Sequence, residues 1–375
     1  MILWLYGAAG AGKSAIAHTL AEICENHGWL VASFFFWRAA GERNNVNRFV
    51  ATIAHQVALA IPQSRELIGT AIDHDPLIFL KSIDTQLSKL VVKPLQQLFS
   101  TGIISDISPF VIIIDGLDEC EGTDIQTSLI KLLATAFHVF PLRIRILIAS
   151  RPEVYLRSTF NSSLVQPHLS QLALSDEYSP EKDICQFLKD SFDKIRHDHP
   201  LAHYIPSSWP SSDILDELTK KSSGQFIFAS TTVKYIGGDP HQLPHRRLDV
   251  VRRLQPPNGE KDMPFAELDS LYHSVLLNVR NIEDVKQVLG VLILTPELDD
   301  GHSPIYSTGQ IDKMFFWQPG KTKACLSQLT SIIGLDRDEN ISILHSSLLD
   351  FLLDPSRSHQ FYLSSPNPPS SRSED

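Results

Sequence analysis

The stretch ILWLYGAAGAGKS, residues 2–14, decides the fold. Ile2–Tyr6 is an unbroken apolar run of strand length, and Gly7–Ser14 follows it directly as G-x-x-x-x-G-K-S, the pattern of a phosphate-binding loop. Its glycines let the backbone turn tightly with N–H groups pointing inward, so the loop and the next helix N-terminus attract an anion. Residues 15–27 have the apolar spacing of a helix that ends at Gly28, which places the loop between a strand and a helix.

Side chains and backbone of this loop are predicted to share the binding of a nucleotide. Lys13 is expected to reach the β- and γ-phosphates, and the Ser14 hydroxyl to bind Mg²⁺. The predicted phosphate cradle consists of Gly7, Gly10, Ala11, Gly12, Lys13, Ser14 and Ala15. A chance Gly/Ala-rich turn is the alternative interpretation, and the flanking strand and helix argue against it.

A second buried strand, VIIID at residues 111–115, ends in a carboxylate. The carboxyl ends of parallel strands meet at the edge of the sheet that faces the nucleotide, so Asp115 is predicted to hold Mg²⁺. Asp118 or Glu119 would then orient the attacking water. An acidic surface loop is the alternative interpretation.

A third strand, RILIAS at residues 145–150, leads to Arg151. If the sheet places this strand between the first two, its tip points at the γ-phosphate and Arg151 becomes a phosphate sensor. Taken alone, an arginine before a proline is more often a capping or surface residue. Further strands are expected over residues 30–37 and 168–174, and flanking helices over residues 48–61 and 84–99.

The composition is ordinary for a soluble globular protein and excludes several classes. The 375 residues are 43% hydrophobic and carry a net charge of −10, which argues against a surface that coats nucleic acid. The four cysteines form no C-x-x-C pair, so reduced thiols and a cytoplasmic location are expected, and no apolar run is long enough to predict a membrane span. H-E-x-x-H, G-x-S-x-G and N-K-x-D patterns are absent, which disfavours proteases, esterases and small GTPases. A strand that begins at residue 2 also suggests a missing upstream domain.

Three motifs in order, GAAGAGKS, VIIIDGLDEC and ILIASRP, resemble the NACHT module of the STAND class of P-loop NTPases. The sequences of these motifs are most similar to those of the fungal NOD-like-receptor and nephrocystin-type branch. FFFWR at residues 34–38 and Gly116 also resemble that branch. The resemblance implies an α/β fold in which an AAA+-like P-loop NTPase sheet flanked by helices precedes a helical lid and a winged-helix subdomain. It also implies the cofactors ATP or ADP with Mg²⁺. By this resemblance Lys13 and Ser14 match the Walker A pair, and Asp115 matches the magnesium aspartate.

The same resemblance assigns the distal acids to Asp118 and Glu119 and the sensor arginine to Arg151. A histidine at the place of His345 touches the bound diphosphate in that family, whereas a lone histidine ahead of an amphipathic helix is usually structural. The expected domains are 1–178, nucleotide-binding; 179–257, helical lid; 258–355, winged helix; and 356–375, a tail with a disordered end.

Three functions stay open at this stage. The leading one is a signalling switch in which ADP holds the winged helix closed on the nucleotide domain, and exchange for ATP permits self-association. Slow hydrolysis, with ATP favoured over GTP, accompanies this function. The second is a nucleotide-binding scaffold without turnover. The third is a phosphotransferase, for which the sequence shows no clear lid arginine cluster or acceptor pocket.

Overall fold

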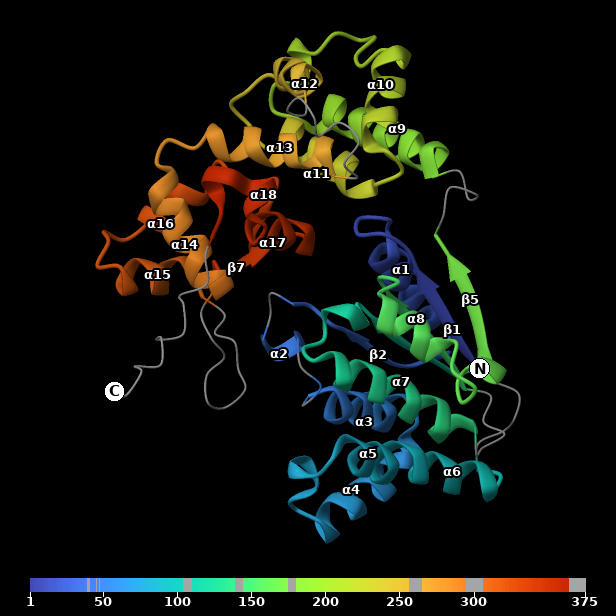
Figure 1. Ribbon diagram of the computed structural model, residues 1–375. Coiled ribbons are helices and arrows are strands. Elements are labelled where there is room, and N and C mark those ends of the chain that lie inside the picture. The colour runs from blue at the N-terminus through green and yellow to red at the C-terminus, as the bar shows by residue number, and fades with distance from the viewer. Residues whose placement is uncertain are drawn as a thin grey trace, which may run out of the picture. The chain divides into compact units, whose positions relative to one another are not determined.

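The computed structural model describes residues 1–38, 41–44, 46, 48–103, 110–138, 144–174, 180–255, 265–294 and 306–363. The chain folds into two compact units, Met1–Ser175 and Asp176–Asp375, and Figure 1 labels most of their helices and several of their strands. The segment 364–375, predicted to be disordered, lies outside the described residues.

A five-stranded parallel sheet forms the centre of the first unit, with the order β2-β3-β4-β1-β5. The strands are β1 (Ile2–Tyr6), β2 (Leu30–Phe35), β3 (Phe110–Asp115), β4 (Ile144–Ser150) and β5 (Leu169–Ala173). Strand β4 pairs with β1 on one side, Leu3 opposite Leu147, and with β3 on the other, Ile112 opposite Ile146. The predicted P-loop NTPase fold is therefore confirmed, and the strand before Arg151 lies between the two motif strands.

Alternate residues of each strand point to opposite faces of the sheet and pack against different helices. On one face, Leu5, Ile113 and Leu147 are buried together with Ala17 and Ala21 of helix α1 (Lys13–Asn26). The other face is covered by helices that include α3 (Phe49–Ala60), α7 (Thr123–His138) and α8 (Val154–Phe160). The apolar runs read from the sequence are thus strands buried on both sides, as a parallel sheet requires.

Trp4 shows how the second face is held together. Its side chain is 1% exposed and stacks on Phe160 of α8, with ring centroids 4.2 Å apart. Its indole Nε1 donates to Ser150 Oγ at 2.9 Å, across the β1 and β4 pairing. A buried indole thus finds its hydrogen-bond partner beside the residue that precedes Arg151.

A group of helices connects β2 to β3. They are α2 (Gly41–Asn44), α3, α4 (Arg65–His74), α5 (Ile83–Leu87) and α6 (Lys93–Ser100). The helix predicted over residues 84–99 is present, but a π-helical turn, Ser88–Val92, interrupts it between α5 and α6. Pro94 explains the interruption, because it has no N–H to donate to the carbonyl one turn earlier, so an α-helical ladder cannot run through it.

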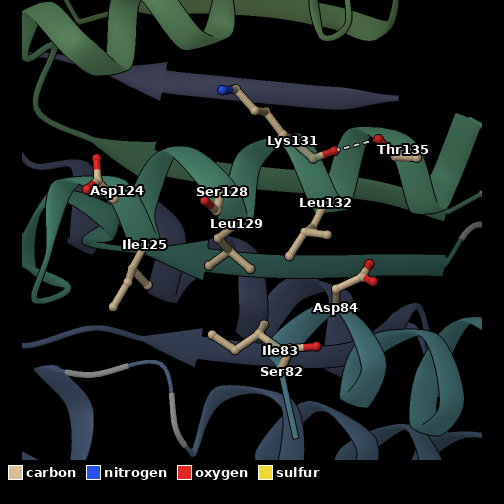
Figure 2. A pocket seen from close by; sticks show the side chains of 10 residues that line it. All are labelled: Ser82, Ile83, Asp84, Asp124, Ile125, Ser128, Leu129, Lys131, Leu132 and Thr135. Carbon is tan, nitrogen blue, oxygen red and sulfur yellow. Dashed lines mark hydrogen bonds between the residues drawn. The ribbon is translucent and has the colours of Figure 1, made fainter.

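A groove of about 560 Å³ lies between α5 and α7. Figure 2 shows Ile125, Leu129 and Leu132 of α7 on one side of it and Ile83 of α5 on the other. Asp84, Asp124 and Lys131 also line this groove, which we call the apolar groove.

The described residues of the second unit are mainly helical and include an antiparallel pair of short strands, β6 (Ile333–Leu335) and β7 (Ile341–Ile343). Its helices are α9 (Pro180–Asp198), α10 (Ser212–Ser222), α11 (Phe226–Gly237), α12 (Pro244–Arg253), α13 (Ala266–Leu277), α14 (Ile282–Leu294), α15 (Thr308–Met314), α16 (Lys321–Leu326), α17 (Ser346–Leu352) and α18 (Pro355–Ser358). None of the helices described in either unit is both long and apolar enough to cross a membrane.

Two buried acids join separate helices of this unit. Asp312 of α15 is 3% exposed and accepts hydrogen bonds from the Gly320 and Thr322 backbone N–H groups, at 2.7 and 2.8 Å, at the start of α16. Asp269 of α13 accepts two from the Arg357 guanidinium of α18, at 2.7 and 3.0 Å. The segment just after residue 355, expected to begin a tail, is therefore helical and packed at its start.

Candidate functional site

The phosphate-binding loop has the backbone that its glycines predict. Gly10 and Gly12 have φ angles of +76° and +91°, in the left-handed region that favours glycine. A Cβ on Gly7 would lie 3.2 Å from the Leu174 carbonyl oxygen and 3.0 Å from its Cβ. The loop therefore passes close to the end of β5 and turns sharply into α1.

Helix α1 begins at Lys13 with Gly12 as its N-cap, and no side chain caps it. The amide N–H groups of a first helical turn have no acceptor within the helix. Those of Lys13, Ser14 and Ala15 are thus placed to bind an anion, aided by the helix dipole and by a first turn without acidic residues.

Lys13 lies against the loop from which it projects. Its Nζ donates to the carbonyl oxygens of Gly7 and Ala8, each at 2.9 Å. Burial lowers the pKa of the Lys13 ammonium from its usual value, and the nearby Asp118 carboxylate opposes this shift. The ammonium thus lies beside the loop backbone, where phosphate oxygens would replace the two carbonyls as its acceptors.

Asp115, the last residue of β3, is 4% exposed, and the Ser14 side chain lies close enough to its carboxylate to lower its pKa. Its Oδ1 is buried without a hydrogen-bond partner. Burial raises the pKa of Asp115 to about 6, and the Ser14 hydroxyl and the Lys13 charge oppose this. An unpaired buried carboxylate oxygen beside a hydroxyl fits Mg²⁺, which prefers oxygen ligands.

No cluster of three or more His, Cys, Asp or Glu side chains suited to a metal occurs in the part of the chain that the structure describes. Mg²⁺ does not need such a cluster, because it usually keeps several waters and binds through one or two carboxylates together with phosphates. Ser14 and Asp115 therefore fit magnesium better than zinc, which is usually held by three or four His, Cys, Asp or Glu side chains.

The turn after Asp115 requires glycine. Gly116 has φ +68°, and a Cβ there would approach the Phe36 carbonyl oxygen to 2.8 Å. The same segment is fixed by a hydrogen bond from the Phe36 N–H to the Asp115 carbonyl, at 2.9 Å. This close approach aligns the ends of β2 and β3 and leads the chain into the short helix Leu117–Glu119.

The structure brings together two residues that were predicted for separate roles, Asp118 and Arg151. Asp118 Oδ1 accepts from the Arg151 backbone N–H at 2.9 Å, and its Oδ2 lies 3.3 Å from Arg151 Nε. The Asp118 side chain is 4% exposed, so this ion pair is largely withdrawn from solvent. Asp118 therefore positions Arg151, which makes it a poorer candidate for orienting water.

Glu119 is the more accessible of the two distal acids, being half-buried. Its Oε2 accepts from the Arg38 backbone N–H at 3.1 Å. Arg38 also places a guanidinium nitrogen 3.5 Å from the Asp118 carbonyl oxygen. Arg38 is the last residue of the FFFWR stretch that resembles the NACHT family, but the sequence assigned it no role in the site.

His345 lies in the second unit, where it is the N-cap of α17. Its Nδ1 accepts from the Ser347 backbone N–H at 3.0 Å and lies 2.8 Å from Ser347 Oγ. Ser347 Oγ in turn lies 2.7 Å from the hydroxyl of the buried Tyr272. The structure thus gives His345 a capping contact within its own unit, and its contact with a nucleotide stays a prediction.

The first part of the chain matches a known family, and its fold has distant likenesses among solved structures. The family described as Nephrocystin 3, N-terminal, matches residues 1–151. A search of curated proteins gave no significant match.

Among solved structures, Aeropyrum pernix ORC1 in complex with DNA is 14% identical, with 92% of this chain and 84% of that chain covered and a TM-score of 0.37. Pyrobaculum aerophilum Cdc6p is 14% identical, with coverages of 91% and 83% and a TM-score of 0.36. Drosophila ORC bound to DNA is 11% identical, with coverages of 96% and 90% and a TM-score of 0.38. Structural similarity at such scores supports no conclusion about function. The P-loop NTPase fold is therefore assigned from the strand order and the loop geometry of this chain.

Proposed function

We propose that the chain is an ATP- and ADP-binding switch of the NACHT type, whose nucleotide state sets its conformation and its self-association. One observation carries the proposal. The buried and unpaired Oδ1 of Asp115 lies at the carboxyl edge of a parallel sheet, in a carboxylate that the Ser14 side chain contacts. A buried polar oxygen without a partner is costly, and a bound cation would satisfy it.

Each residue of the site has a proposed task. The amides of the loop and the Lys13 ammonium bind the phosphates, while Ser14 and Asp115 hold Mg²⁺. Bound Mg²⁺ would neutralise charge on the phosphates. Glu119 orients water for slow hydrolysis, and Arg151, placed by Asp118, senses the terminal phosphate.

The ion pair between Asp118 and Arg151 would let the protein respond differently to ATP and to ADP, as a switch requires. A ligand shifts a conformational equilibrium only if it binds the two states differently. A γ-phosphate competes with the Asp118 carboxylate for the Arg151 guanidinium, whereas ADP leaves the pair intact. Only ATP would therefore rearrange the acidic loop after β3.

The second unit is proposed to respond to the nucleotide. Residues 179–257 would form the lid and residues 258–355 a winged-helix subdomain, for which α15 and α16 followed by the antiparallel pair β6 and β7 provide support. By the same proposal, exchange of ADP for ATP releases the second unit and permits self-association of the chain in the cytoplasm.

Lys13→Ala tests nucleotide binding. We expect the affinity for MgADP to fall by roughly 10- to 100-fold or more, because charge-assisted hydrogen bonds to phosphate are lost. The melting temperature of the nucleotide-free protein should change little. Binding is measured with a fluorescent ADP analogue, and Lys182→Ala, an exposed lysine of α9, is the control. Equal affinity in Lys13→Ala and the parent protein would refute the proposal.

A nucleotide-binding scaffold without turnover is the second candidate. The engagement of Asp118 by Arg151 and of Glu119 by the Arg38 N–H favours it, since both distal acids already accept hydrogen bonds. Phosphate release from MgATP under single-turnover conditions separates the two candidates. Release that Glu119→Gln abolishes supports the switch with hydrolysis, and no release supports the scaffold.

A further inference from the structure

A pocket of about 570 Å³ opens on the first unit between α4 and the helix that contains the π turn. Three lysines line it from separate places in the chain, Lys81 after α4, Lys89 in the π turn and Lys93 at the start of α6. We call this the lysine pocket. The Gln97 amide of α6 and the His74 imidazole of α4 also line the pocket.

The charges of the lysine pocket do not balance. Oδ2 of Asp75 accepts from Lys81 Nζ at 2.6 Å and from Lys89 Nζ at 3.0 Å, and these hydrogen bonds hold the pKa of Asp75 below its usual value. Lys93 forms no salt bridge with any residue that the structure describes. Three ammonium groups against one carboxylate leave a local excess of positive charge, on a chain whose net charge is −10.

The apolar groove shows that a concave surface of this size does not by itself collect positively charged side chains. It has almost the same volume, about 560 Å³, but apolar side chains line both of its sides. Its charged residues are Asp84, Asp124 and Lys131, so the acids outnumber the single lysine (Figure 2). Of these two concave surfaces, the lysine pocket is the one that gathers cations, whose fields add and attract an anion.

We propose that the lysine pocket binds a small, multiply phosphorylated anion. Phosphate oxygens would displace the Asp75 carboxylate from Lys81 and Lys89, and a further phosphate would pair with Lys93. Lysine ammonium groups act as point charges with rotatable donors, so they accept phosphates in several orientations. The pocket volume lies within the range of about 300–1,000 Å³ typical of small-molecule sites.

The π turn supports this assignment. It carries Lys89, while its residues Leu90 and Val91 are fully buried in the core of the unit. Pro94 accompanies the irregular turn, and the backbone there sets the spacing of the Lys89 and Lys93 Cα atoms, from which the two side chains reach the pocket. π-Helical turns within α-helices occur frequently at functional sites.

The test uses the full chain saturated with MgADP, so that the phosphate-binding loop does not compete for the probe. Inositol hexakisphosphate and inorganic tripolyphosphate are titrated by calorimetry at low and at physiological salt. We expect binding that weakens with salt, and Lys89→Gln and Lys93→Gln should each weaken it roughly tenfold or more. Asp75→Asn should act in the opposite direction and tighten binding, because it removes the competing carboxylate.

Lys131→Gln is the matched control, since it removes one positive charge from the same unit but from the apolar groove. It should leave the affinity within a factor of about two. If only inositol hexakisphosphate binds, the preferred class is a ring-borne polyphosphate. If only tripolyphosphate binds, the preferred class is a linear polyphosphate. The proposal fails if neither probe binds at low salt, or if Lys131→Gln weakens binding as much as Lys93→Gln does. It also fails if Asp75→Asn weakens binding, since the Asp75 carboxylate would then be structural.

Discussion

At the scale of single residues, the burial of the Asp115 carboxylate suits it to bind a cation but lowers the stability of the folded protein. Its carboxylate is buried, one oxygen lacks a partner, and its pKa is raised to about 6. A carboxyl group with a raised pKa binds more protons in the folded protein than in the unfolded chain. Its charged form therefore destabilises the nucleotide-free protein above pH 6, and this cost disappears as the pH falls toward the unfolded pKa of 3.8.

Asp115→Asn tests whether the charged Asp115 carboxylate destabilises the nucleotide-free protein. We expect the nucleotide-free variant to be more stable than the parent protein at pH 8, by about 1–3 kcal/mol, with the difference shrinking below pH 6. Urea unfolding at pH 8 and pH 4.5 measures both. The same variant should bind MgADP more weakly, because a neutral amide replaces the magnesium ligand. Equal stability of the two proteins at both pH values would show that the Asp115 charge is not penalised.

At the scale of secondary-structure elements, helix α17 depends on the residue before it. His345 caps its N-terminus through the hydrogen bond from the Ser347 N–H to Nδ1, and Ser347 connects this cap to the buried Tyr272. Burial raises the pKa of the Tyr272 hydroxyl, so Tyr272 stays protonated and keeps a hydrogen available for this contact. A change at position 345 therefore acts first on the second unit, whether or not His345 also touches a nucleotide.

His345→Ala should lower the free energy of unfolding by about 0.5–2 kcal/mol, the usual cost of losing an N-cap. His345→Asn separates capping from nucleotide contact, since asparagine is a good N-cap but is shorter than histidine. We expect the asparagine variant to retain most of the stability and to release ADP faster. Release of a fluorescent ADP analogue, measured beside chemical unfolding, reports both effects. An unchanged release rate in both variants would leave His345 with the capping role alone.

At the scale of the whole molecule, the chain forms two compact units, and the proposed switch requires that a ligand of the first also stabilise the second. A ligand at 100 times its Kd stabilises the form that binds it by about 2.7 kcal/mol. If ADP binds the closed form, this stabilisation is shared between the two units.

We therefore expect MgADP to slow amide hydrogen exchange in peptides of both units, including those of α13 and α17. Mass spectrometry of the exchanged peptides measures this, and Lys13→Ala is the control in which neither unit should respond. Protection confined to the first unit would leave nucleotide binding intact but would contradict the switch.

The sequence alone determined the frame of the site. The apolar run before Gly7, the glycines of the loop and the strand ending at Asp115 are local signals, and they fixed β1, the start of α1 and β3 within one or two residues. Parallel strands bring their carboxyl ends to one edge, so the meeting of Ser14 and Asp115 followed from the fold class. Arg151 was expected to reach the γ-phosphate only if its strand lay between the two motif strands. The sheet order places β4 between β1 and β3, as this expectation requires.

The tertiary structure alone decided which partners the charged residues take. The pairing of Asp118 with Arg151 joins the ends of two strands, and the lysine pocket joins Asp75 to Lys89 across separate helices. Such contacts depend on packing and on backbone irregularities, here the π turn before Pro94, and these leave no periodic trace in the sequence. Sequence patterns report which face of an element is buried, whereas the choice among several nearby acids and bases follows from angstrom-scale distances that only the packed chain sets.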